Sequence, residues 1–230
     1  MNHHLNITTK TCRQVFSLFL IPLLSCHQTN QKMAIAKVDT VYKHDTVYLS
    51  ETEKDWQANF GLTHDPAKDS IAGKPVSYYL DDKECPQIAY EFYYGYFRPS
   101  DDGATDELLK YAVTDNNKLR PFLRWCLDRT INISDGALAE QVGQPARRYA
   151  EKFPEEFFIY MDSDTTNQRY KNWVEAISYS GFYEREDWTN DKKIRTRMIN
   201  SMKRNCKKMN ATIETRINAF TAACFKEKTD

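Results

Sequence analysis

The chain has 230 residues, with 32 basic and 32 acidic side chains, so its formal net charge at neutral pH is zero. This balance excludes a bulk electrostatic drive toward nucleic acid, and we expect no nucleic-acid partner. Seven glycines and eight prolines are few for this length, and no proline follows Pro154. Because helix breakers are scarce over so long a stretch, we expect an all-α protein.

An apolar run near the N-terminus ends in a cysteine. Residues 15–26 read VFSLFLIPLLSC and follow Lys10 and Arg13, with no acidic residue before them. The apolar part, residues 15–24, is about half of the roughly 20 residues that a membrane-spanning helix needs. A basic start, a short apolar middle and a small residue before a break are typical of a secretory signal.

The end of this run, Leu23-Leu24-Ser25-Cys26, resembles the lipobox of bacterial lipoproteins. The resemblance implies that residues 1–25 are a signal peptide, that cleavage occurs before Cys26, and that the Cys26 thiol carries lipid. Acyl chains would make the membrane a partner through this anchor. His27 stands where that family's inner-membrane retention signal has Asp, which favours the periplasmic face of the outer membrane. An ordinary cleaved signal and an uncleaved anchor are the alternatives.

The next segment, residues 26–81, is expected to be a flexible tether followed by irregular chain. Asp39-Thr-Val-Tyr42 is repeated as Asp45-Thr-Val-Tyr48, and the β-branched and aromatic content favours extended chain or a short strand. From residue 50 to 83 the chain is broken by two glycines and two prolines. We expect no regular structure there beyond a short helix over residues 51–59.

A helical domain is predicted over residues 82–230. It begins with the aromatic stretch CPQIAYEFYYGYFR at residues 85–98. Helical spacing puts Tyr90, Tyr93, Tyr94 and Phe97 on one face, whereas strand spacing aligns a different set, and we favour the helix because the neighbouring segments are helical. The four rings are a candidate stacking surface for a sugar or a peptide. Packing in the core is the alternative use.

Further helices are predicted over residues 105–113, 118–130, 135–152, 154–161 and 165–179 from their apolar stripes. Thr165 and Gln168 have the spacing of a capping box at the start of the last of these. Pro154 suits the first position of its helix. We expect these helices to pack as an irregular bundle.

The last predicted element is the longest. Apolar residues from Met198 to Cys224 stay in one helical stripe, which indicates a single long helix or two nearly collinear ones. A polar stretch at residues 205–212 is the one place where a turn could interrupt it. The opposite face carries a basic set that is a candidate surface for an acidic partner or anionic lipid, with an ordinary solvated face as the alternative. This set is Lys203, Arg204, Lys207 and Lys208.

Four cysteines remain after the signal and the lipid site: Cys85, Cys126, Cys206 and Cys224. An even number in an oxidising compartment predicts two disulfides. In one continuous helix Cys206 and Cys224 would lie about 27 Å apart, too far for a bond that needs Cα atoms within about 7 Å. Each would then pair with Cys85 or Cys126, whereas a turn would bring Cys206 and Cys224 together. We expect no metal site, because no CxxC pair is present and no histidine follows His64.

Signatures of catalysis are scarce in this chain. Phosphate-binding glycine motifs are absent, and a serine or cysteine nucleophile would need a histidine from the N-terminal part. We therefore expect no cofactor and lean against an enzyme. The leading hypothesis is a lipid-anchored envelope protein that acts as a non-enzymatic binding or interaction module, of scaffold or inhibitor type, for a protein partner. The alternative is an envelope hydrolase that acts on glycan or peptide through carboxylates, which a deep cleft with two carboxylates of raised pKa would favour.

Overall fold

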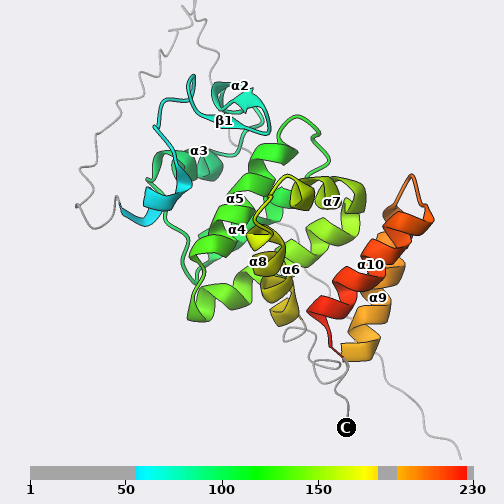
Figure 1. Ribbon diagram of the computed structural model, residues 1–230. Helices are drawn as coiled ribbons and strands as arrows, with labels where there is room; N and C mark the ends of the chain where they lie inside the picture. Colours follow the sequence, from blue (N-terminus) through cyan, green and yellow to red (C-terminus); the bar gives the residue numbers. More distant parts are fainter. Residues whose placement is uncertain (1–54, 181–190, 227–230) are drawn as a thin grey trace, which may run out of the picture. The chain divides into compact units, whose positions relative to one another are not determined.

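A computed structural model describes residues 55–180 and 191–226 of the chain, and in these residues the fold is all-α (Figure 1). The predicted signal peptide, Cys26 and most of the tether lie outside the described residues. The described helices are α2 (Ser77–Leu80), α3 (Gln87–Tyr94), α4 (Gly103–Lys110), α5 (Arg120–Ile133), α6 (Gly136–Lys152), α7 (Pro154–Asp162), α8 (Gln168–Tyr179), α9 (Asp191–Asn205) and α10 (Ala211–Cys224). None of them is both long and apolar enough to cross a membrane.

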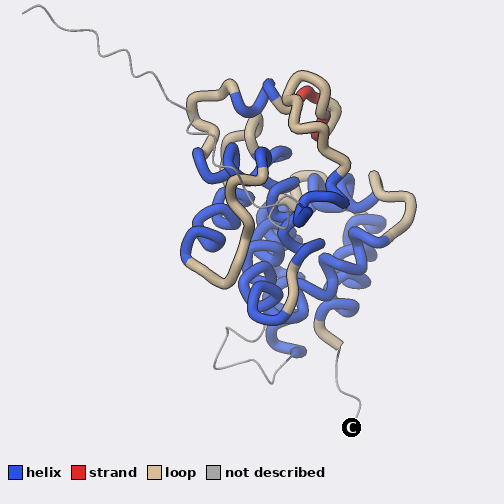
Figure 2. The backbone as a smooth tube through the Cα atoms, turned by 90° about the vertical axis from the view of Figure 1, so that its left-hand side faces the viewer, coloured by secondary structure: helices blue, strands red, loops and turns tan. Residues whose placement is uncertain are grey.

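Two short 3₁₀ turns and one small hairpin complete the described fold. The turns are η1 (Asp55–Phe60) and η2 (Tyr111–Val113). Strands β1 (Ser70–Ile71) and β2 (Lys74–Pro75) pair antiparallel, with Ser70 opposite Pro75. Figure 2 shows this hairpin at one end of the helices. The prediction of an irregular helix bundle is therefore confirmed.

Local sequence signals explain several helix starts. Asp102 accepts a hydrogen bond from the Thr105 backbone amide at 2.8 Å and caps α4. Pro154 begins α7, as predicted. The predicted capping box at Thr165 is wrong, because α8 begins three residues later, after Asn167 in a left-handed conformation. Asp164 instead accepts the Arg169 amide at 2.8 Å, so an earlier carboxylate satisfies the free donors of that helix end.

Two clusters of buried apolar side chains make up the core. The N-terminal cluster is centred on Phe60, Tyr79, Phe92, Phe122 and Trp125, and the C-terminal cluster on Tyr149, Phe157, Trp173, Met198 and Phe220. Helix α5 belongs to both, since its first half packs in one cluster and its second half in the other. Each large side chain contributes about 1.5–3 kcal/mol through burial.

The folded unit extends further toward the N-terminus than the predicted boundary at Asp82. Phe60 and Tyr79 are buried in the N-terminal cluster, although their segment is irregular. Asp69 ties this segment to α3, because it accepts the hydroxyl of Tyr93 at 2.7 Å and the backbone amides of Thr63 and His64. Residues 56–81 are mostly irregular, as expected, but they contribute side chains to the core, and they also contain the hairpin and α2, which were not predicted. The predicted short helix is the 3₁₀ turn η1.

The predicted long C-terminal helix is wrong. Helices α9 and α10 are separated by a turn and lie side by side as a hairpin (Figure 1). Asn210 caps α10 by accepting the Ile213 amide at 2.9 Å. Both helices face the C-terminal cluster, so their apolar residues keep the same stripe although the chain reverses between them.

The predicted disulfides are not present among the described cysteines. Cys85, Cys126, Cys206 and Cys224 are all free thiols. Cys206 follows the end of α9, and Cys224 ends α10. Because the helix between the turn and Cys224 rises about 1.5 Å per residue, the hairpin leaves these two cysteines roughly 20 Å apart. The turn therefore separates them rather than bringing them together.

Helices α6 and α8 approach each other closely at Gly143. A Cβ atom at this position would lie 2.7 Å from the carbonyl oxygen of Ala176 and 3.0 Å from the amide nitrogen of Ser180. Both atoms belong to the backbone of the segment at the end of α8, so neither can rotate away. Glycine at this position is what allows the close contact.

Candidate functional site

A groove of about 1110 Å³ lies between α5, α7 and the α9–α10 hairpin. One wall comes from α5 and α7, and the other from the turn and the start of α10. The side chains that give it its chemical character are Arg120, Arg124, Glu156, Ile159, Lys207 and Lys208.

Two glutamates in the first turn of α7 connect it to its neighbours. Glu156 accepts two hydrogen bonds from Arg120 of α5, at 2.9 and 2.7 Å. Glu155 accepts the backbone amide of Lys208 at 2.7 Å. Burial raises the pKa of Glu156, but the hydrogen bond and charge of Arg120 outweigh it and hold that pKa below its usual value. Glu156 thus holds α7 against α5 within one wall, and Glu155 ties that wall to the facing turn.

The lining carries more positive than negative charge. Six basic side chains line it, against the three acidic side chains Asp115, Glu155 and Glu156. Two of the basic groups, Arg120 and Lys152, are paired with acids of the lining. Lys207 and Lys208 are exposed, and neither ammonium group makes an ion pair with any described residue. The groove thus offers uncompensated cations to an anionic ligand.

Like Arg120 one helical turn before it, Arg124 is mostly buried. Only 9% of the residue is exposed, and its single hydrogen bond within the described chain goes from Nη1 to the Tyr149 hydroxyl at 3.0 Å. Its guanidinium carbon lies 3.9 Å from the centre of the Tyr160 ring. The Nε atom is buried and has no hydrogen-bond partner.

Apolar side chains stand beside the basic ones. Ile159 of α7 is 71% exposed, the largest exposed fraction among the big hydrophobic side chains of the described chain. Ile213 lines the opposite wall, and Met209 in the adjoining turn is exposed as well. A ligand in this groove would meet an apolar contact and several cations together.

The structure gathers only half of the predicted basic set in the groove. Lys207 and Lys208 line it. Lys203 instead forms an ion pair with Glu214 of α10, and Arg204 is exposed on α9 with its guanidinium donating to Ser201.

The predicted aromatic set does not form one exposed face. Tyr93 is fully buried, with its hydroxyl donating to Asp69, so it belongs to the core. Tyr90, Tyr94 and Phe97 are half-buried. Tyr94 stacks on Tyr96, with 5.9 Å between ring centres, and Tyr96, which was not in the predicted set, is the most exposed ring of the group. Tyrosines 90, 94 and 96 therefore make a small patch on and after α3, away from the groove lining.

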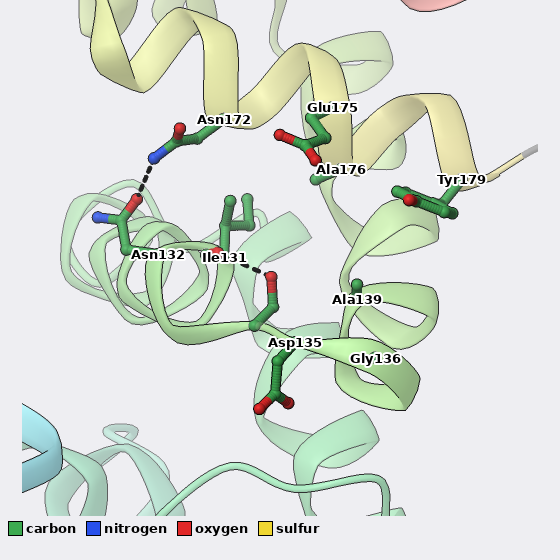
Figure 3. Close-up of a pocket in the computed structure, with 10 residues that line it drawn as sticks. Ile131, Asn132, Asp135, Gly136, Ala139, Asn172, Glu175, Ala176 and Tyr179 are labelled. Carbon is green, nitrogen blue, oxygen red and sulfur yellow. Dashed lines mark hydrogen bonds between the residues drawn. The ribbon is translucent and has the colours of Figure 1, made fainter.

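A second pocket, of about 310 Å³, lies between α5, α6 and α8 and holds two carboxylates (Figure 3). Asn172 donates to Asn132 across its mouth at 2.8 Å. Glu175 extends over the pocket, whereas the carboxylate of Asp135 points away from it (Figure 3). Both acids are exposed. They do not face each other across a space for a glycosidic bond, as a paired-carboxylate hydrolase requires.

A third hollow, of about 480 Å³, lies between α4 and α6. Its three acids, Asp101, Asp106 and Glu140, are accompanied by Lys110 and Arg148. Asp101 accepts a hydrogen bond from Gln141 at 2.5 Å. In the part of the chain that the structure describes, no three acidic, histidine or cysteine side chains are grouped to hold a metal ion.

The chain matches no protein-family model, no curated protein and no solved structure. The assignment of a site therefore depends on the geometry of this chain alone. Sequence reasoning missed Arg120, Arg124, Glu156 and Ile159. One signal was available: Arg120 and Arg124 are four residues apart on a helix whose other residues are mostly apolar, so they share one face.

Proposed function

We propose that this protein is a lipid-anchored binding module of the bacterial cell envelope, without catalytic activity, which holds an acidic segment of a partner protein in the groove. The observation that carries the proposal is the combination of exposed Ile159 with unpaired Lys207 and Lys208 on the facing wall. Membrane attachment at Cys26, on the periplasmic side of the outer membrane, is supported by the lipobox resemblance alone.

The size of the groove favours a peptide over a small molecule. Small-molecule pockets measure about 300–1,000 Å³ and enclose most of their ligand, whereas this groove reaches about 1110 Å³ and is open. Interfaces gain most of their affinity from a few apolar or arginine anchors, while surrounding charges set the association rate and the partner. Ile159 is suited to the first role, and the two lysines are suited to the second.

The probe for this proposal is a fluorescein-labelled peptide, Glu-Glu-Leu-Glu-Glu, with an analogue in which glutamine replaces every glutamate. Anisotropy titrations should show binding of the acidic peptide only. Lys207→Glu/Lys208→Glu should weaken binding by about tenfold or more and flatten its salt dependence, since the rim charges would then repel the ligand. Ile159→Asp should weaken it similarly through loss of the apolar contact.

The matched control reverses two other exposed lysines, Lys83→Glu/Lys171→Glu, which lie outside the groove lining. This variant has the same net charge as the groove variant, so a bulk charge effect would weaken both equally. Equal weakening, or equal binding of the glutamine analogue, would show that the groove is not the site.

The alternative function, an envelope hydrolase working through carboxylates, has less support. Its best candidate pair, Asp135 and Glu175, lines a small pocket but does not converge on it (Figure 3). A double substitution, Asp135→Asn/Glu175→Gln, tests this pair directly. Loss of glycan or peptide hydrolysis by purified protein in that variant would favour the enzyme.

A further inference from the structure

Two arginines of α5 line the groove one helical turn apart, and they differ in how they are satisfied. Every nitrogen of the Arg120 guanidinium donates a hydrogen bond. Nε and Nη2 donate to Glu156, Nη1 donates to the carbonyl of Thr114, and Nη2 also donates to Asn117. Arg124 has one neutral partner, the Tyr149 hydroxyl, and no carboxylate within ion-pair distance among the described residues. The hydrogen bonds of Arg120 are therefore made within the chain, whereas Arg124 keeps donors that have no partner in the described residues.

The carboxylates nearest in the network are already engaged. Asp128, which is 2% exposed, accepts the indole N–H of Trp173 at 2.7 Å and lies 3.6 Å from Nε of Arg169. Glu156 is held by Arg120. Glu156 is also linked to Arg124 through the Tyr149 hydroxyl, and the charge of Arg124 helps to lower the pKa of Glu156. Arg124 is therefore a mostly buried cation that makes no direct ion pair with a described carboxylate. Such a charge is costly to a fold unless something compensates it.

Aromatic rings hold Arg124 in place. Tyr160 lies against its guanidinium, and Arg169 contacts the same ring at 4.0 Å from its centre. The planar fork of a guanidinium matches the two oxygens of a carboxylate, and a fork that is already immobilised loses little entropy on binding. Arg124 also lines the groove, so a ligand bound there can reach the part of its side chain that is exposed.

We infer that Arg124 is the carboxylate-binding residue of the groove: it binds one carboxylate of the acidic segment in a direct ion pair, which no described residue of the chain makes with it. This inference rests on the proposed function and names the group that fixes the ligand's position. Lys207 and Lys208 attract further acidic side chains at the rim, and Ile159 contacts the neighbouring apolar one.

Two substitutions of Arg124 test this role with the labelled acidic peptide. Arg124→Met removes the charge while keeping a long side chain, and should weaken binding by about 30-fold, the scale for losing one partner of a desolvated charge pair. Arg124→Lys keeps the charge without the fork and should give an intermediate loss. The melting temperature of Arg124→Met should equal or exceed that of the wild type, because an unpaired cation has left the interior. A marked fall in melting temperature would instead assign Arg124 a structural role and overturn the inference.

The effect of free acetate on the melting temperature distinguishes carboxylate binding by Arg124 from peptide binding in the groove. Acetate, compared with chloride at equal ionic strength, should raise the melting temperature of the wild type and of Lys207→Glu/Lys208→Glu, but not that of Arg124→Met. If the peptide fails to bind and acetate still acts through Arg124, the carboxylate site stands and the proposed function fails. If the lysine and isoleucine variants lose the peptide and Arg124→Met does not, the groove stands and the inference fails. Stabilisation by phosphate but not by acetate would also overturn it, since the ligand group would then be a phosphate.

Discussion

The contact between α6 and α8 predicts a clear effect of one added methyl group. In Gly143→Ala the new Cβ would lie 2.7 Å from the Ala176 carbonyl oxygen and 3.0 Å from the Ser180 amide nitrogen. Real side chains do not come so close, so the two helices must separate by several tenths of an ångström. Overpacking of this kind costs about 1–3 kcal/mol. The better helix propensity of alanine returns at most about 1 kcal/mol.

We therefore expect Gly143→Ala to lower the free energy of unfolding by about 1–2 kcal/mol, on balance of these two effects. Urea unfolding followed by circular dichroism measures it as a lower midpoint with an unchanged slope. Gly103→Ala is the matched control, because a Cβ there meets nothing within 4 Å and the residue begins α4. That variant should be neutral or slightly more stable. A Gly143→Ala protein as stable as the wild type would refute the close-contact argument.

Three further predictions concern the N-terminal part of the fold and the anchor. Burial raises the pKa of Asp69, but hydrogen bonds from Thr63, Tyr93 and His64 together hold that pKa below its usual value. The ionised Asp69 therefore stabilises the fold fully above the unfolded pKa of about 3.9, and this stabilisation is lost as pH falls through the lower folded pKa. Asp69→Asn should thus melt below the wild type at pH 7, and the gap should close in acid; a constant gap would exclude the carboxylate as its cause. A chain of residues 55–230 should melt cooperatively, whereas one of residues 82–230 should not, because it lacks Phe60 and Tyr79; equal melts by circular dichroism would contradict this boundary. Cys26→Ala should release the protein from the membrane fraction and leave an uncut precursor on immunoblots, and normal processing of that variant would disprove the lipobox.

The sequence predicted most of the bundle because its helices have local signals. Helix α6 was expected over residues 135–152 and is Gly136–Lys152, and α7 was expected over 154–161 and is Pro154–Asp162. Pro154 follows the end of α6 and begins α7, and both helices carry apolar stripes. The hairpin was missed because two antiparallel helices that face one core can share a stripe, which periodicity reads as continuity. Asn210, a good N-cap before an apolar run, was the signal that marked the turn.

The groove could not be predicted from the sequence in the same way. A helical arginine is read as surface, and only the packing of Tyr149 and Tyr160 places Arg124 inside. An isoleucine in an apolar helix gives no local sign of exposure, yet Ile159 is exposed while its neighbour Phe158 is buried. Both outcomes depend on how α7 lies against α5, and no local pattern encodes that arrangement.

Among the described helices, α5 alone contributes residues to both clusters and to the groove lining. Residues 122–128 are buried without interruption, so neighbours surround the helix on every side over nearly two turns. Amide hydrogens there can exchange with solvent only when the whole molecule opens, and their protection should report the global free energy of unfolding. We therefore expect the backbone that carries Arg124 to be among the slowest to exchange in the described chain. A ligand bound to Arg124 would add its binding energy to the stability of both clusters at once.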